Sequence, residues 1–167
     1  LEDFERIVMP GITHWQHPRF FAYFPANSSP PAVLAELLTA GIAAQCMLWQ
    51  TSPAATEMET RILAWLAEML GLGSGWHGVI QDTASSATLV AVLVARERAT
   101  GWRADAEGLG SCPPLAVYTS AEAHSSVEKA VRVAGLGRKA LRLVPTDDAF
   151  AMRPDALEAL IRSDLEA

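Results

Sequence analysis

The second half of the chain alternates short apolar segments with longer helical patterns, and this alternation restricts the fold more than any other feature. Three short apolar segments have the length and composition of buried strands: residues 79–81, 115–118 and 140–144. A helical pattern follows each of them: residues 87–100, 125–134 and 154–167. Because strands that are connected through helices pair in parallel, the sequence predicts an α/β fold with a largely parallel sheet.

The first half of the chain has a different character. Its first thirty residues are rich in aromatic residues and prolines, which exclude a regular helix or central strand throughout and indicate an ordered arm. An alanine-rich helix is predicted over residues 31–44. A second helix is predicted to begin at Pro53, with Ser52 as its N-cap, and to end at Gly71.

Composition excludes several classes of partner. The net charge is −6, the pI is about 5.2, and no run of Lys or Arg is present, so neither nucleic acid nor an anionic membrane is an expected partner. No apolar stretch approaches bilayer length, and the first residues do not resemble a signal peptide. We therefore expect a soluble, cytoplasmic protein. Cys46 and Cys112 lie far apart without metal-site spacing, so neither a disulfide framework nor a zinc site is predicted.

Both ends of the sequence look like interruptions. The chain opens on Leu1, and it closes within a helical pattern that lacks a Gly, Asn or Pro stop signal. We expect it to be part of a longer polypeptide.

His124 lies where the predicted strand 115–118 gives way to the helix 125–134. Ligands of open α/β folds bind at the carboxyl ends of strands, so the flat imidazole could face a ligand there. A histidine at such a position is more often structural, bonding or packing locally. This second interpretation holds unless other segments point to the same site.

The segment Asp82–Ser86 is a second candidate, because small residues let backbone amides approach a ligand. Thr83, Ala84 and Ser85 precede a helix whose positive N-terminal end would attract a phosphate. The same residues would also make an ordinary N-cap, and the sequence alone favours neither interpretation. The glycines of a P-loop or a dinucleotide-binding turn are missing, which disfavours ATP and NAD.

Other constellations give weaker signals. A Ser–His hydrolase using His124 with Ser125 or Ser126 is disfavoured, since no Gly-x-Ser-x-Gly elbow is present. His14 and His17 lack a third ligand at a suitable spacing, so a metal site is not expected. The aromatic residues of the arm are expected to pack in the core or at an interface. They would line a substrate pocket only if the arm lies beside the ligand site.

Several segments together resemble a known family. They are Met9-Pro-Gly-Ile-Thr-His-Trp15, His17-Pro-Arg-Phe-Phe-Ala-Tyr-Phe-Pro25, Ser52-Pro-Ala-Ala-Thr-Glu57, Val79-Ile-Gln81 with Ala84-Ser85, and Ala123-His-Ser-Ser-Val-Glu-Lys-Ala130. In order and spacing they resemble the group II pyridoxal-phosphate-dependent decarboxylases, and within them the enzymes of aromatic L-amino acids. The resemblance covers nearly the whole chain.

The resemblance implies a fold, a domain organisation and an activity. It implies the type I, aspartate aminotransferase-like α/β fold, with residues 1–51 as an N-terminal arm and helix and residues 52–167 as the first part of the large cofactor-binding domain. It also implies a homodimer that uses pyridoxal 5′-phosphate (PLP) to convert an aromatic L-amino acid into its amine and carbon dioxide.

The resemblance also implies roles for particular residues. His124 would stack on the pyridine ring of PLP and serve as the catalytic histidine, while Thr83, Ala84 and Ser85 would bind its phosphate. Substrate-pocket positions would be Trp15, Tyr23, Phe24 and Pro25 within one subunit, with Gln45 and Met47 reaching across the dimer interface.

The sequence departs from the family pattern in three respects. The lysine that binds the cofactor covalently lies downstream in family members and matches neither Lys129 nor Lys139, so the isolated 167-residue chain is expected to be inactive. Ala26 stands where many members have threonine, and Gln45 and Met47 replace more apolar and aromatic residues. Two alternatives stay open: an aromatic aldehyde synthase of the same family, and a non-catalytic fragment that serves only dimerisation.

Overall fold

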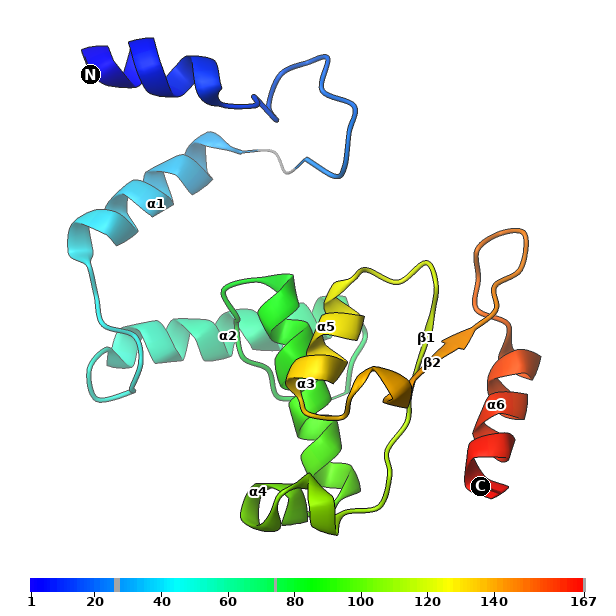
Figure 1. Ribbon diagram of the computed structural model, residues 1–167. Helices are drawn as coiled ribbons and strands as arrows, with labels where there is room; N and C mark the ends of the chain where they lie inside the picture. Colours follow the sequence, from blue (N-terminus) through cyan, green and yellow to red (C-terminus); the bar gives the residue numbers. More distant parts are fainter. Residues whose placement is uncertain (26–27, 74, 167) are drawn as a thin grey trace. The chain divides into compact units, whose positions relative to one another are not determined.

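The computed structural model describes residues 1–25, 28–73 and 75–166. These residues form two compact units, Leu1–Leu66 and Ala67–Ala167, which are described separately (Figure 1). No helix among the described residues is long and apolar enough to cross a bilayer.

The first unit consists of helices joined by irregular segments. A π-helical turn, η1 (Phe4–Val8), and a 3₁₀ turn, η2 (Met9–Gly11), precede the long helix α1 (Pro30–Ile42). The Ser29 hydroxyl caps α1 by accepting a hydrogen bond from the N–H of Ala32 at 3.4 Å, and Pro30 occupies the first helical position. Helix α2 (Pro53–Met69) begins in this unit. Both predicted helices are therefore confirmed.

Apolar side chains of the first unit lie open to solvent. None of its described residues is buried. Helix α1 exposes apolar side chains on much of its surface: Val33, Leu34, Leu37, Leu38 and Ile42. Helix α2 exposes a further set: Met58, Ile62, Trp65 and Leu66.

The second unit contains a two-stranded parallel sheet, as the alternation of the sequence predicts. Strand β1 (Val117–Ser120) pairs with β2 (Leu141–Val144), with Val117 opposite Leu141. The connection between them includes helix α5 (Ser126–Val133) and the 3₁₀ turn η4 (Arg138–Ala140). Val131 of α5 and Val144 of β2 are fully buried and form the centre of the core.

The remaining elements of this unit are three helices and one 3₁₀ turn: α3 (Ala84–Ala99), α4 (Arg103–Glu107), η3 (Leu109–Ser111) and α6 (Pro154–Glu166). Helix α3 packs against α5. Helix α6 confirms the predicted terminal helix, whose last residue, Ala167, lies outside the described residues.

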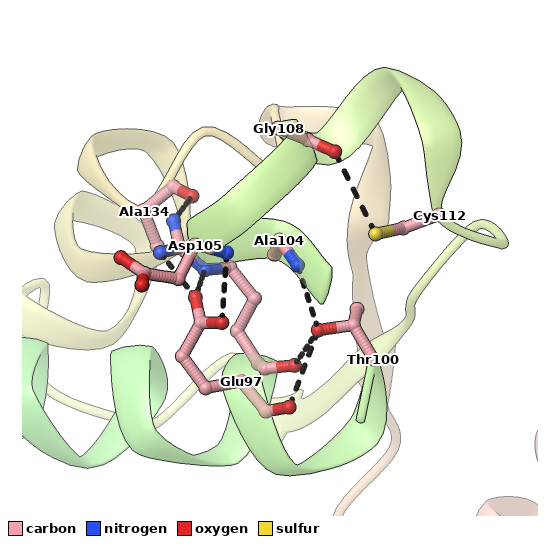
Figure 2. Close-up of polar contacts among 8 residues, drawn as sticks. Glu97, Thr100, Ala104, Asp105, Gly108, Cys112 and Ala134 are labelled. Carbon is pink, nitrogen blue, oxygen red and sulfur yellow. Dashed lines mark hydrogen bonds and ion pairs between the residues drawn. The ribbon is translucent and has the colours of Figure 1, made fainter. Parts of the chain in front are cut away.

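A polar cluster at the end of α3 joins three helices (Figure 2). The guanidinium of Arg96 donates to Oε1 of the buried Glu97 at 2.6 and 2.9 Å, and the other Glu97 oxygen accepts from the N–H of Asp105 in α4 at 3.1 Å. Arg96 also donates to the carbonyl of Ala134 at the end of α5, at 2.7 Å. One ion pair therefore satisfies backbone groups of both neighbouring helices, which fixes α3, α4 and α5 together.

Helix α6 is attached to the sheet by a second polar cluster. The Asp164 carboxylate accepts from the Tyr118 hydroxyl of β1 at 2.7 Å, and from the Arg142 guanidinium of β2 at 2.8 to 3.0 Å. A single carboxylate thus joins both strands to α6.

Three details differ from the sequence prediction. Residues 79–81 do not form a strand in the part of the chain that the structure describes. Helix α3 begins at Ala84 instead of residue 87, since Thr83 caps it. Residues predicted as a polar loop include the short helix α4, which begins after Trp102 adopts a left-handed backbone conformation.

Candidate functional site

The first turn of α3 holds the residues predicted to bind a phosphate. Thr83 has an extended backbone and is the N-cap, with its Oγ1 accepting from the N–H of Ser86 at 3.2 Å. Its hydroxyl also lies 3.0 Å from the Ser86 hydroxyl. Ala84 and Ser85 occupy the first two helical positions. The segment is therefore an N-cap in this structure, and both interpretations made from the sequence still apply to it.

The donor groups at this end of α3 suit a phosphate. N–H groups of a first helical turn have no carbonyl partner within the helix. The N–H of Ser86 donates to the Thr83 hydroxyl. An anion could therefore bind the N–H groups of Ala84 and Ser85 and the exposed Ser85 hydroxyl.

Asp82 adds a negative charge beside these donors. A hydrogen bond from the Ser86 hydroxyl is the main cause that lowers the pKa of the Asp82 carboxyl, and the N–H groups of Asp82 and Thr83 lower it further. Together these hydrogen bonds outweigh desolvation, which raises the pKa. The carboxylate therefore already lies at the positive end of the helix, and a phosphate would have to bind beside it.

His124 lies in the loop between β1 and α5, and Ser126 fixes its ring. The N–H of the buried Ser126 donates to His124 Nδ1 at 3.2 Å, and the Ser126 Oγ lies 3.0 Å from the same nitrogen. Since a backbone N–H can only donate, Nδ1 is an acceptor, and the neutral ring carries its proton on Nε2. The ring itself is exposed, so its faces are accessible.

Helices α3 and α5 bring their N-terminal ends to the same side of the second unit (Figure 1). The Arg96–Ala134 hydrogen bond joins their C-terminal ends, which is consistent with helices that run in the same direction. The candidate phosphate turn precedes one of these helices and His124 precedes the other. No hydrogen bond among the described residues joins the two segments directly.

The cluster of Tyr118, Asp164 and Arg142 holds the strand that leads to His124. The Arg142 guanidinium and then the Tyr118 hydroxyl lower the pKa of Asp164 against desolvation. The same carboxylate, by accepting a hydrogen bond from the phenolic hydroxyl, raises the pKa of Tyr118. The position of β1, and with it the start of the His124 loop, therefore depends on this charged cluster.

Two of the predicted substrate-pocket residues lie together in the first unit. The rings of Trp15 and Tyr23 are stacked, with centroids 5.4 Å apart and an interplanar angle of 6°. Trp15 also stacks on Phe20, at 5.2 Å and 26°. Three aromatic residues of the arm therefore contact one another, whereas Phe21 and Phe24 are exposed.

The other predicted pocket residues are exposed within this unit. Phe24 and Pro25 follow Tyr23, and Gln45 and Met47 lie between α1 and α2. Their roles in binding a substrate stay predictions. The substitution at Ala26 concerns a position outside the described residues.

Comparison with known proteins supplies the family. The chain matches the pyridoxal-dependent decarboxylase conserved domain over residues 1–167. The chain belongs to the pyridoxal-dependent decarboxylases. The family resemblance and the fold class expected from the sequence are thereby confirmed, because the solved structures of this family superpose on the chain with high scores.

Individual members of the pyridoxal-dependent decarboxylases are similar over the whole chain. Aromatic-L-amino-acid decarboxylase of Bos taurus is 46% identical, and phenylacetaldehyde synthase of Arabidopsis thaliana is 40% identical; the matches cover 100% of this chain and 36% and 35% of those proteins. The structure of Oryza sativa TDC with PLP and tryptamine has a TM-score of 0.89 at 35% identity, covering 99% of this chain and 35% of that one. The chain therefore spans about a third of the length of these pyridoxal-dependent decarboxylases.

Sequence reasoning missed two residues at this candidate decarboxylase site. The sequence offers Ser126 only as a disfavoured nucleophile, whereas its backbone N–H and hydroxyl orient His124 in the structure. The sequence places Asp82 in a turn, and in the structure its carboxylate adds a negative charge beside the phosphate donors. A serine two residues after a loop histidine, at the start of a helix, was the available signal.

Proposed function

We propose that this chain is the N-terminal part of a PLP-dependent enzyme that decarboxylates an aromatic L-amino acid to its amine. The observation that carries the proposal is the fixed imidazole of His124, which directly precedes α5, together with the shared side of the N-terminal ends of α3 and α5 (Figure 1). The family match and the aromatic-amino-acid enzymes among the relatives support it.

Within this proposal, the residues divide between binding and orientation. The N–H groups of Ala84 and Ser85 and the hydroxyls of Thr83 and Ser85 would hold the cofactor phosphate. His124, kept in one orientation by Ser126, would lie against the cofactor ring and present its Nε2 proton. PLP, when bound, accepts the electron pair that the departing carboxylate leaves on the substrate.

The aromatic arm would bind the substrate side chain. Trp15, Tyr23, Phe24 and Pro25 provide flat apolar surface, which suits an aromatic ring. We further propose a homodimer in which Gln45 and Met47 reach the site of the partner subunit. The cytoplasmic location expected from the sequence stays a prediction.

This proposal makes the isolated chain incomplete. The lysine that binds the cofactor covalently would lie in the remainder of the polypeptide, and the segments 1–51 and 52–167 would be the arm and the first part of the large domain. Activity must therefore be measured on the complete polypeptide.

An aldehyde synthase is the second candidate, because one relative is a phenylacetaldehyde synthase. The two activities differ in products. A decarboxylase releases carbon dioxide and the amine without oxygen, whereas an aldehyde synthase consumes oxygen and water and releases carbon dioxide, the aldehyde, ammonia and hydrogen peroxide.

The test supplies the complete polypeptide and PLP with L-tryptophan, L-tyrosine or L-phenylalanine, with L-glutamate as a control, and measures amine, aldehyde and oxygen uptake. Amine from an aromatic substrate without oxygen uptake is the expected result. Aldehyde with stoichiometric oxygen uptake would establish the synthase instead. Turnover of L-glutamate alone, or no PLP binding and no turnover, would overturn the proposal.

A further inference from the structure

Asp82 carries a negative charge directly before the N-cap of α3. Two other aspartates with a lowered pKa, Asp155 and Asp164, each form an ion pair with an arginine. Asp82 forms no ion pair among the residues that the structure describes; the Ser86 hydroxyl and then the N–H groups of Asp82 and Thr83 lower its pKa. Its charge is therefore held by hydrogen bonds of the turn and is not neutralised by a cation.

The hydroxyls of this turn form one series of hydrogen bonds that ends on Asp82. Thr83 Oγ1 and Ser86 Oγ lie 3.0 Å apart, so one of these hydroxyls donates to the other. Each hydroxyl can donate only one hydrogen bond. Because the Ser86 hydroxyl donates to the Asp82 carboxylate, the Thr83 hydroxyl must donate to Ser86. The Thr83 hydroxyl therefore has no hydrogen bond left to donate to a phosphate.

A cofactor phosphate would need the position and the donors that Asp82 uses. The positive N-terminal end of α3 attracts an anion, and Asp82 supplies one from within the chain. A phosphate monoester carries a charge of about −1.5 to −2 at pH 7, so a neighbouring carboxylate repels it. A phosphate that binds at this turn must therefore displace the Asp82 carboxylate or bind against this repulsion.

The turn allows the carboxylate to leave without loss of the cap. Asp82 is exposed and lies outside α3. Thr83 caps the helix by accepting from the N–H of Ser86 at 3.2 Å, a hydrogen bond in which Asp82 takes no part. Once the carboxylate leaves, the Ser86 hydroxyl can donate to Thr83, and the Thr83 hydroxyl can donate to a phosphate.

We propose that Asp82 competes with the cofactor phosphate for the N-terminal turn of α3, so that it holds this turn in the cofactor-free protein and weakens cofactor binding. This inference rests on the proposed function. It assigns Asp82 an effect opposite to that of Thr83, Ala84 and Ser85, which the proposed function assigns to phosphate binding.

Absorbance titration of the complete, cofactor-free polypeptide with PLP tests the competition. Asp82→Asn removes the charge and should lower the Kd for PLP about tenfold. Asp82→Glu keeps the charge and should bind PLP much more weakly than Asp82→Asn does. The control is Asp148→Asn, which makes the same change of net charge in the exposed loop between β2 and α6 and should leave the Kd unchanged.

Pyridoxal separates the phosphate from the rest of the cofactor, because it has the same ring and aldehyde without the phosphate. Its Kd should be equal in the wild type and in Asp82→Asn. A Kd for PLP that is unchanged or higher in Asp82→Asn would overturn the inference. An equal gain in affinity for pyridoxal would also overturn it, because Asp82 would then act on another part of the cofactor.

Thermal unfolding adds a measurement on the cofactor-free protein. Asp82→Asn should lower the Tm of this form, because the end of α3 loses its anion. The same concentration of PLP should then raise the Tm of Asp82→Asn by more than that of the wild type. An unchanged Tm of the cofactor-free variant would show that the carboxylate does not hold the turn, which would overturn the inference.

The titration also distinguishes this inference from the proposed function. PLP binding by neither the wild type nor Asp82→Asn would contradict the proposed function and, with it, the inference. Equal PLP binding by both would contradict only the role of Asp82.

Discussion

At the scale of single residues, the orientation of His124 depends on its neighbour. Ser126 is buried and donates its N–H to Nδ1, so the ring presents Nε2 and its flat faces outward. This arrangement needs only the first turn of α5, whose N-terminal residues follow the loop directly. A histidine with one fixed tautomer suits both contact with a cofactor ring and movement of a proton.

The first prediction concerns this histidine. His124→Ala in the complete enzyme should lower kcat/KM at least about 100-fold, as expected for a group that contacts the cofactor and helps to move protons. The unfolding midpoint should stay close to that of the wild type, because the ring is exposed. His77→Ala, which removes another exposed histidine, is the matched control. Near-normal activity of the His124→Ala variant would show that His124 has no catalytic role.

The second prediction concerns the phosphate turn. Ser85→Ala should raise the Kd for PLP about tenfold, because one hydroxyl donor to the phosphate is lost. Ser85 makes no cap hydrogen bond in α3, so this variant separates cofactor binding from helix capping. Absorbance titration with PLP gives the Kd. The control is Thr88→Ala, because Thr88 lies one turn further along α3 and its hydroxyl donates to the Ala84 carbonyl. Unchanged affinity in Ser85→Ala would leave this turn as a plain N-cap.

At the scale of elements, the attachment of α6 to the sheet depends on the ionised form of Asp164. Arg142 and Tyr118 lower the pKa of Asp164 in the folded state, so folding favours the carboxylate. A depressed pKa gives stability that is present above the unfolded value near 3.9 and is lost as the pH falls through the lower folded value.

The third prediction follows from this sign. The wild type should be more stable than Asp164→Asn at pH 6, and the difference in Tm should shrink as the pH falls below about 4. Thermal unfolding followed by circular dichroism from pH 2 to 7 measures this difference. The control is Asp148→Asn, because Asp148 is exposed and forms no ion pair with another described residue. A difference that is constant across this range would show that Asp164 acts through packing instead of charge.

The fourth prediction concerns the end of α5. Gly135 has a φ of 80°, and it closes the helix by donating its N–H to the Arg132 carbonyl, while Leu136 donates to the Val131 carbonyl. A Cβ there would also lie 3.0 Å from a Leu109 methyl group. Gly135→Ala should therefore lower the free energy of unfolding by about 1–3 kcal/mol.

Urea denaturation measures this loss, with Gly110→Ala as the matched control. A Cβ at Gly110 would meet nothing within 4 Å, and its φ is not positive. Equal stability of the two variants would contradict the role of Gly135.

The sequence predicted those elements whose signals are local. Helix α2 has a serine at its N-cap and a proline at its first position. Apolar residues recur with strand spacing in β2 and with helical spacing in α6. The strand predicted over residues 79–81 is wrong, because a short apolar run does not by itself specify strand pairing. The start of α3 was misplaced because Ala84, Ser85 and Ser86 suit a turn as well as a first helical turn. The orientation of His124 depends on a hydrogen bond to Ser126, which no spacing rule supplies.

At the scale of the whole molecule, the first unit needs a covering surface. None of its described residues is buried, and α1 carries its exposed leucines, Leu34, Leu37 and Leu38, on one side of the helix. Exposed apolar surface of this kind marks an interface. The proposed homodimer would supply that surface.

The fifth prediction tests this role of α1. Leu34→Glu with Leu38→Glu should convert a dimer of the complete polypeptide into a monomer, because two charges would be buried without partners. Light scattering coupled to size-exclusion chromatography gives the mass. Glu36→Gln, which changes a charge on the same helix without adding one to an apolar position, should stay dimeric. A double variant that is still a dimer would place the interface elsewhere.

The measurement that tests the central claim most directly is a crystal structure of the complete polypeptide with PLP bound. The account predicts the cofactor phosphate at the first turn of α3, within hydrogen-bond distance of Ser85, and the His124 ring against the pyridine ring. A phosphate bound away from Thr83, Ala84 and Ser85, or an imidazole that does not contact the cofactor, would contradict it.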